Sequence, residues 1–144
     1  MAITLSYESS VRATPEQVWA KFSDITCWPR FNKAIAGVRW LDGEPWHRGA
    51  KLAMDLVQPR PMTVESVLDE VVAPNLLRLK GKMMGVSAEH TFEFTAQPDG
   101  TTKMRTEQVL TGAATIFISE KMKSAATSAF ANWFDGMRRE IESV

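Results

Sequence analysis

The sequence predicts an α+β domain in which a curved antiparallel sheet of about six to seven strands wraps around one long C-terminal helix, with two short helices after the first strand. Three observations predict it. Residues 89–112 (EHTFEFTAQPDGTTKMRTEQVLTG) alternate as two strands of a hairpin. The segment from Thr115 to the end carries an apolar stripe at helical spacing. Shorter alternating segments precede both.

The N-terminal third predicts a strand followed by two helical segments. Residues 3–12 alternate between apolar and polar side chains. Thr14 is a suitable N-cap, Pro15 suits the first helical position, and Gln17 completes a capping box. A broken helical segment follows over 24–31, and we expect it to stop at Pro29.

Four further strands are predicted before the hairpin, over residues 38–41, 51–57, 62–72 and 76–83. The apolar residues of 62–72 fit neither face cleanly, so the sequence leaves the register of that strand open.

The Pro98-Asp99-Gly100 loop fixes the register of the hairpin. A three-residue loop with Gly in the left-handed position makes Gln97 and Thr101 the flanking pair. The predicted cross-strand pairs are Phe94 with Met104, Phe92 with Thr106, His90 with Gln108, and Glu93 with Arg105. The last pair joins opposite charges on the outer face, which supports the assignment.

The apolar stripe of the final helix changes in size along its length. It comprises Met122, Ala125, Ala126, Ala129, Phe130, Trp133, Met137 and Ile141. The stripe is small at its start and bulky at its end, so the sequence leaves two alternatives: a cavity over part of the sheet, or close packing that uses Ala for near approach.

The composition restricts the function classes. Seventeen basic residues balance seventeen acidic ones, which argues against a nucleic-acid partner held by bulk charge. The single Cys27 and two distant His residues make neither a disulfide nor a recognisable metal site, and no cofactor motif is present. The start lacks the pattern of a secretion signal, and no apolar run approaches the ~20 residues that span a bilayer. We expect a cytoplasmic protein without stable membrane insertion.

The segment RATPEQVWAKFSDITCWPRFNKAI resembles the opening of the SRPBCC superfamily, which includes START, Bet v 1 and polyketide cyclase/dehydrase-like proteins. The matching residues are Ala13, Pro15, Glu16, Val18, Trp19, Asp24, Trp28, Pro29, Asn32 and Ile35, with Thr14 inserted before the proline. Later segments, including AEHTFEF and FANWFDGMRREI, are similar to its small bacterial single-domain branch. The resemblance implies the helix-grip fold and a single domain over 1–144. It specifies function weakly, because this superfamily holds carriers and enzymes alike.

The expected site is an apolar cavity between the sheet and the C-terminal helix. Its predicted lining is Met54, Leu56, Leu79, His90, Phe92, Phe94, Met104, Thr106, Gln108, Met122, Ala126, Ala129 and Trp133. His90 is the candidate chemical group, because it interrupts an apolar wall and a buried His can act as acid, base or hydrogen-bond partner. A purely structural His90, satisfied by Gln108 across the hairpin, is the alternative.

The function that these features favour is binding of a small hydrophobic molecule, such as a lipid, a polyketide or an aromatic metabolite. The second alternative is a polyketide cyclase, aromatase or dehydratase, a lyase or isomerase with His90 as general acid/base. It ranks lower because His90, Gln108 and Thr106 are few polar groups for such chemistry. A third alternative, implied by the superfamily, is a co-chaperone-like module that binds a protein partner. The sequence leaves the oligomeric state, including a homodimer, open.

Overall fold

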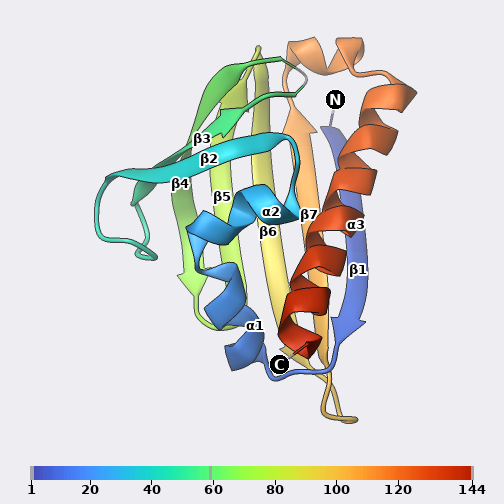
Figure 1. Ribbon diagram of the computed structural model, residues 1–144. Helices are drawn as coiled ribbons and strands as arrows, with labels where there is room; N and C mark the ends of the chain where they lie inside the picture. Colours follow the sequence, from blue (N-terminus) through green and yellow to red (C-terminus); the bar gives the residue numbers. More distant parts are fainter. Residues whose placement is uncertain (1, 59, 144) are drawn as a thin grey trace.

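The structure is a computed structural model that describes residues 2–58 and 60–143. A seven-stranded antiparallel sheet, in the order β1-β7-β6-β5-β4-β3-β2, curves around the long helix α3 (Glu120–Glu142) (Figure 1). The strands are β1 (Ala2–Val11), β2 (Ile35–Asp42), β3 (Lys51–Leu56), β4 (Met62–Val72), β5 (Leu76–Met83), β6 (Val86–Ala96) and β7 (Thr102–Thr111). The predicted fold class is confirmed.

Short helices occupy the positions that the sequence predicted after the first strand. They are α1 (Pro15–Phe22), the 3-10 turn η1 (Ile25–Cys27) and α2 (Trp28–Phe31). Thr14 Oγ1 accepts a hydrogen bond from Gln17 N at 3.2 Å, and Gln17 Oε1 accepts one from Thr14 N at 2.8 Å. The capping box is therefore confirmed, and α1 begins at Pro15 as predicted.

Two predicted helix boundaries were wrong. Pro29 does not stop the second helical segment but lies in the first turn of α2, where its missing N–H costs no hydrogen bond. The last helix starts at Glu120 instead of Thr115, because Ser119 caps it through a hydrogen bond from Met122 N to Ser119 Oγ at 3.2 Å. The residues before this cap form a separate 3-10 turn, η2 (Ala113–Phe117).

The hairpin of β6 and β7 has the predicted register. His90 pairs with Gln108, and the charged pair Glu93–Arg105 follows on the other face. Gln97 N donates to Thr101 O at 2.8 Å, and Gly100 between them has a φ of 87°. A short loop of fixed geometry therefore determines which side chains face α3.

A register shift in β4 explains why its sequence fits neither face. The pairing of β4 with β5 shifts between Leu68 and Glu70. Ser66 and Leu68 lie on the face toward α3 before the shift, and Val71 pairs with Leu77 after it. The extra residue changes the alternation within one strand, so a single period cannot describe it.

The core is centred on aromatic rings contributed by α1, α2, the sheet and α3. Phe22 lies within 4.8–6.4 Å, between ring centroids, of six other aromatic rings. Trp46 lies in the loop between β2 and β3 and packs against Trp40 at 5.1 Å and Trp19 at 5.6 Å, measured between ring centroids. Its loop folds back over the core with a left-handed φ of 63° at Trp46, which composition alone does not predict.

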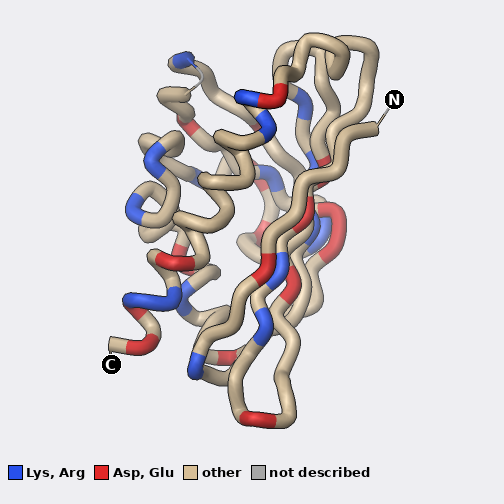
Figure 2. Tube along the Cα trace, turned by 90° about the vertical axis from the view of Figure 1, so that its right-hand side faces the viewer, with Lys and Arg blue, Asp and Glu red and all other residues tan. Residues whose placement is uncertain are grey.

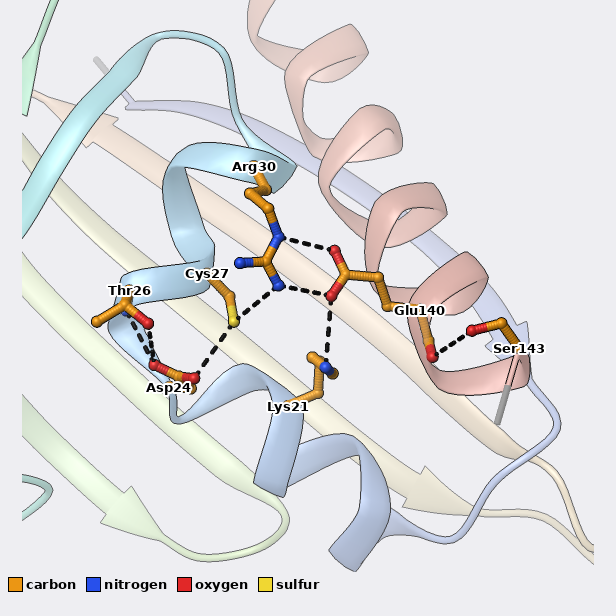
Figure 3. A network of polar contacts seen from close by, with 7 residues as sticks. All are labelled: Lys21, Asp24, Thr26, Cys27, Arg30, Glu140 and Ser143. Carbon is orange, nitrogen blue, oxygen red and sulfur yellow. Dashed lines mark hydrogen bonds and ion pairs between the residues drawn. The ribbon is translucent and has the colours of Figure 1, made fainter.

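A polar network fixes the C-terminal half of α3 to the short helices (Figure 3). Arg30 Nε donates to Glu140 Oε2 at 3.1 Å, and Arg30 Nη2 donates to Glu140 Oε1 at 2.7 Å. Lys21 Nζ lies 3.4 Å from the same Oε1. The hydrogen bond from Arg30 lowers the pKa of Glu140. Cys27 is buried beside this network, and burial raises the pKa of its thiol.

The same end of α3 lies close against α2. Gly136 is buried, and a Cβ placed on it would lie 3.0 Å from Phe31 Cδ1. The network and this close approach anchor the second half of α3, whereas its first half extends past α1 and α2 along the sheet (Figure 1).

Candidate ligand-binding site

The inner face of the sheet, which faces α3, divides into two zones by burial. Near α1 and α2, its apolar side chains are packed, and Leu77, Phe94 and Met104 are fully buried. Toward the start of α3, side chains on the same face remain partly accessible. We call this second zone the half-covered surface, and it includes Met54, Leu56, Met62, Val64, Met83, Ala88, His90, Gln108 and Leu110.

The structure places the predicted lining residues in both zones. Six of them are partly accessible at or opposite the half-covered surface: Met54, Leu56, His90, Gln108, Ala126 and Ala129. Another six are buried in the packed zone or at its edge: Leu79, Phe92, Phe94, Met104, Thr106 and Trp133. The bulky end of the α3 stripe packs onto the sheet, whereas the small side chains at its start leave the sheet half covered.

The expected inward position of Met122 was wrong. Its side chain is 45% exposed, because α3 begins only two residues earlier and Met122 lies in its first turn. On the opposite end of the stripe, Phe134 is fully buried and packs near Tyr7, with 6.0 Å between ring centroids. Phe134 is absent from the predicted stripe, which passes through its neighbour Trp133.

Five partly accessible residues of the half-covered surface were also missed: Met62, Val64, Met83, Ala88 and Leu110. Pairing places them on the inner face, because Leu56 pairs with Met62, Met54 pairs with Val64, and Ala88 pairs with Leu110. Alternation from His90 points to Ala88, so that signal was present in the sequence. The β4 residues were hidden by the register shift.

His90 lies at the boundary between the two zones. Its ring stacks on Phe92, with centroids 4.3 Å apart and an interplanar angle of 26°, and lies 5.2 Å from the Phe130 ring of α3. Its Nε2 atom is 2.7 Å from Oγ1 of Thr106. The alternative in which Gln108 satisfies His90 is therefore not what the structure shows, because the ring turns along the strand toward Phe92 and its Nε2 reaches the diagonal residue, Thr106.

Burial lowers the pKa of His90 to about 4. The cause is desolvation, which disfavours the charged imidazolium. At neutral pH the ring is therefore uncharged and presents one donor and one acceptor nitrogen. His90 is a polar contact within an apolar wall and not a fixed positive charge.

Trp133 supplies a second polar atom in the interior. Its Nε1–H is buried and has no hydrogen-bond acceptor within the described part of the chain. Trp28 differs, since its Nε1 donates to the carbonyl oxygen of Phe22 at 2.7 Å. An unpaired buried N–H costs about 1–3 kcal/mol relative to a satisfied one, so Trp133 is a donor available to an acceptor atom that reaches it.

A hollow also lies on the opposite, outer face of the sheet. It has a volume of about 760 Å³ and is lined by outward side chains of β4 to β7, including Glu65, Lys80, Lys82 and Glu89. These charges differ from the apolar character of the half-covered surface, and no predicted site residue lines the hollow.

Two further findings concern the described residues as a whole. Across 2–58 and 60–143, no group of three or more His, Cys, Asp or Glu side chains is arranged to hold a metal ion. No helix in these residues is both long and apolar enough to cross a bilayer.

The family follows from comparison of the whole sequence. Residues 2–142 match the family described as polyketide cyclase / dehydrase and lipid transport. The chain belongs to this family. The match confirms the resemblance to the SRPBCC superfamily, and it covers the sheet, the short helices and α3 together. Among curated proteins, none matches the sequence.

Solved structures of this family's fold agree closely in shape. A START superfamily protein from Mycobacterium smegmatis superposes with a TM-score of 0.78 at 15% identity, covering 97% of each chain. Ara h 8.0201 gives 0.81 at 12% identity over 100% of both chains. Norcoclaurine synthase from Thalictrum flavum, solved with dopamine and hydroxybenzaldehyde, gives 0.75 at 13% identity and covers 99% of this chain and 88% of that one. At these identities the likeness shows the fold alone.

Proposed function

We propose that the protein binds a small hydrophobic molecule between the half-covered surface and the first half of α3. The observation that carries this proposal is the partial exposure of Met54, Leu56, Val64 and Leu110 on the inner face of the sheet. Near α1 and α2, by contrast, Leu77, Phe94 and Met104 on the same face are fully buried. A ligand that covered them would remove apolar surface from water at about 25 cal/mol per Å², which is enough for micromolar affinity.

Polar atoms at the boundary favour a ligand that is apolar but not purely hydrocarbon. The amide of Gln108 and the neutral imidazole of His90 lie on the same surface, and both can donate and accept hydrogen bonds. A few polar groups in an apolar site typically orient a ligand. Lipids, polyketides and aromatic metabolites that carry a hydroxyl or carbonyl group have this chemistry.

The surroundings of His90 favour binding over acid-base catalysis. A general base works best when its pKa is near the working pH, whereas burial lowers the pKa of His90 to about 4. Its one hydrogen bond to a described residue goes to the hydroxyl of Thr106, which does not raise its basicity as a carboxylate does. We therefore place the carrier function before a cyclase or dehydratase activity.

The proposal is tested by a substitution that fills the space between the half-covered surface and α3. The probe is N-phenyl-1-naphthylamine, a neutral apolar dye whose fluorescence rises when it leaves water. Ala126→Trp places a large ring opposite the half-covered surface, whereas Ser128→Trp places the same ring on the exposed side of α3. We expect the wild type and Ser128→Trp to bind the dye and Ala126→Trp to lose at least about tenfold in affinity. Equal binding by both folded variants would place the dye elsewhere.

A further inference from the structure

Three connections lie at the end of the molecule where the half-covered surface lies. They are the β3–β4 loop, the β5–β6 turn and the η2 segment before α3, all at the end farthest from the C-terminus (Figure 1). A Cβ placed on Gly85 would lie 3.3 Å from Ala114 Cβ, and one on Gly112 would lie 2.9 Å from Gly85 O. The β5–β6 turn and η2 therefore pack against each other.

This end carries most of the large apolar side chains that are exposed to water. Phe117 is 77% exposed and Ile116 is 70% exposed, the highest values among them. We call the following set the apolar tip: Val57, Met84, Ile116, Phe117 and Met122. Leu56, Met62 and Met83 of the half-covered surface flank the same connections.

The segments that carry the apolar tip hold more cations than anions. Segments 56–62, 82–87 and 111–123 contain Arg60, Lys82, Lys121 and Lys123 but one acidic residue, Glu120, which pairs with Lys123 at 3.0 Å. The whole chain has no net charge, so this excess of positive charge is local. Figure 2 shows Lys and Arg segments, with an acidic segment beside them, at the end of the molecule opposite the C-terminus.

We propose that the apolar tip docks peripherally on an anionic lipid surface. Exposed Phe and Ile side chains flanked by Lys and Arg fit the boundary between acyl chains and negatively charged headgroups. Charge complementarity favours this occupant over a second copy of the chain, since two copies meeting tip to tip would bring like charges together. The proposal rests on the proposed function, because docking would bring the half-covered surface next to its ligand source.

Vesicle co-sedimentation tests the docking. The vesicles are phosphatidylcholine alone, or phosphatidylcholine with about one third phosphatidylserine. The test variant is Ile116→Ser/Phe117→Ser. The matched control is Val72→Ser, since Val72 is 52% exposed at the opposite end of the sheet. A second pair is Lys121→Glu against Lys51→Glu, both at exposed positions.

We expect the wild type and both controls to bind the anionic vesicles more tightly than the neutral ones. The serine double variant and Lys121→Glu should each lose about tenfold or more in vesicle affinity. The docking proposal would be overturned if the wild type bound anionic vesicles no more tightly than neutral ones, or if the test variants bound anionic vesicles as tightly as their controls. Tip-dependent self-association without vesicle binding would also overturn it, in favour of a second copy as occupant.

Dye uptake in vesicle-free solution separates this proposal from the preceding one. The serine double variant should still bind N-phenyl-1-naphthylamine as the wild type does, since its changes lie outside the half-covered surface. If the wild type takes up the dye but does not bind anionic vesicles, the docking proposal alone is overturned. If the wild type binds anionic vesicles but does not take up the dye, the proposed ligand site alone is overturned.

Discussion

His90 and Thr106 lie diagonally across the β6–β7 hairpin, with Nε2 of one 2.7 Å from Oγ1 of the other. Thr106 is buried, whereas His90 keeps part of its surface accessible. The contact therefore joins the packed core to the half-covered surface. Because a hydroxyl can donate or accept, the direction of this bond follows the tautomer of neutral His90: Nδ1 donates when Nε2 accepts from Thr106, and Nδ1 accepts when Nε2 donates to it.

The lowered pKa of His90 predicts that the protein loses stability in acid. The unfolded state binds a proton near pH 6.5, whereas the folded state does so near pH 4, so unfolding takes up a proton between these values. The contribution of His90 to the free energy of unfolding does not change with pH well above 6.5, and it falls as the pH decreases from 6.5 toward 4. We expect His90 to account for a loss of about 2 kcal/mol between pH 7 and pH 5.

Urea unfolding of His90→Gln at both pH values measures this loss. The variant should lose less stability than wild type over that interval, while His47→Gln, changed at an exposed loop position, should behave like wild type. Identical pH dependence in wild type and His90→Gln would show that the folded state already accommodates a protonated His90.

We expect the same substitution, Trp to Phe, to change the free energy of unfolding by different amounts at two buried positions. Trp28→Phe removes a donor from the carbonyl of Phe22, whereas Trp133→Phe removes an N–H without an acceptor in the described chain. Both changes lose similar ring area. We expect Trp28→Phe to be the more destabilising by about 1–2 kcal/mol in ligand-free protein, measured by urea unfolding. Equal losses would mean that Trp133 Nε1 is satisfied in solution.

Gly136 sets the distance between α2 and α3. Replacing a helical Gly with Ala gains about 1 kcal/mol in helix propensity, but the new Cβ meets Phe31 at 3.0 Å. We expect these effects to offset each other in Gly136→Ala. Gly136→Val adds branched atoms to the same contact and should destabilise by about 1–3 kcal/mol. Thermal unfolding decides, with Ser128→Val on the exposed side of α3 as the control. A neutral Gly136→Val would show that the two helices separate easily.

Local sequence determined the hairpin register and the start of α1, because a Pro-Asp-Gly loop and a capping box act over a few residues. The boundary between the packed zone and the half-covered surface was not predictable in this way. It depends on where α3 is anchored by Glu140 and Gly136, which requires contacts with α2 more than a hundred residues earlier. The β4 shift and the inward fold of Trp46 likewise depend on tertiary packing.

The methionines give the most direct test of the ligand site, because they sample every environment in the molecule. Met54, Met62 and Met83 belong to the half-covered surface, and Met104 and Met137 are fully buried in the packed core. The measurement is a titration of ¹³C-methyl-methionine-labelled protein with N-phenyl-1-naphthylamine, followed by NMR. We predict saturable shifts concentrated at Met54, Met62 and Met83, with Met104 and Met137 little changed. Shifts confined to other methionines, or none at saturating dye, would contradict a ligand site between the sheet and α3.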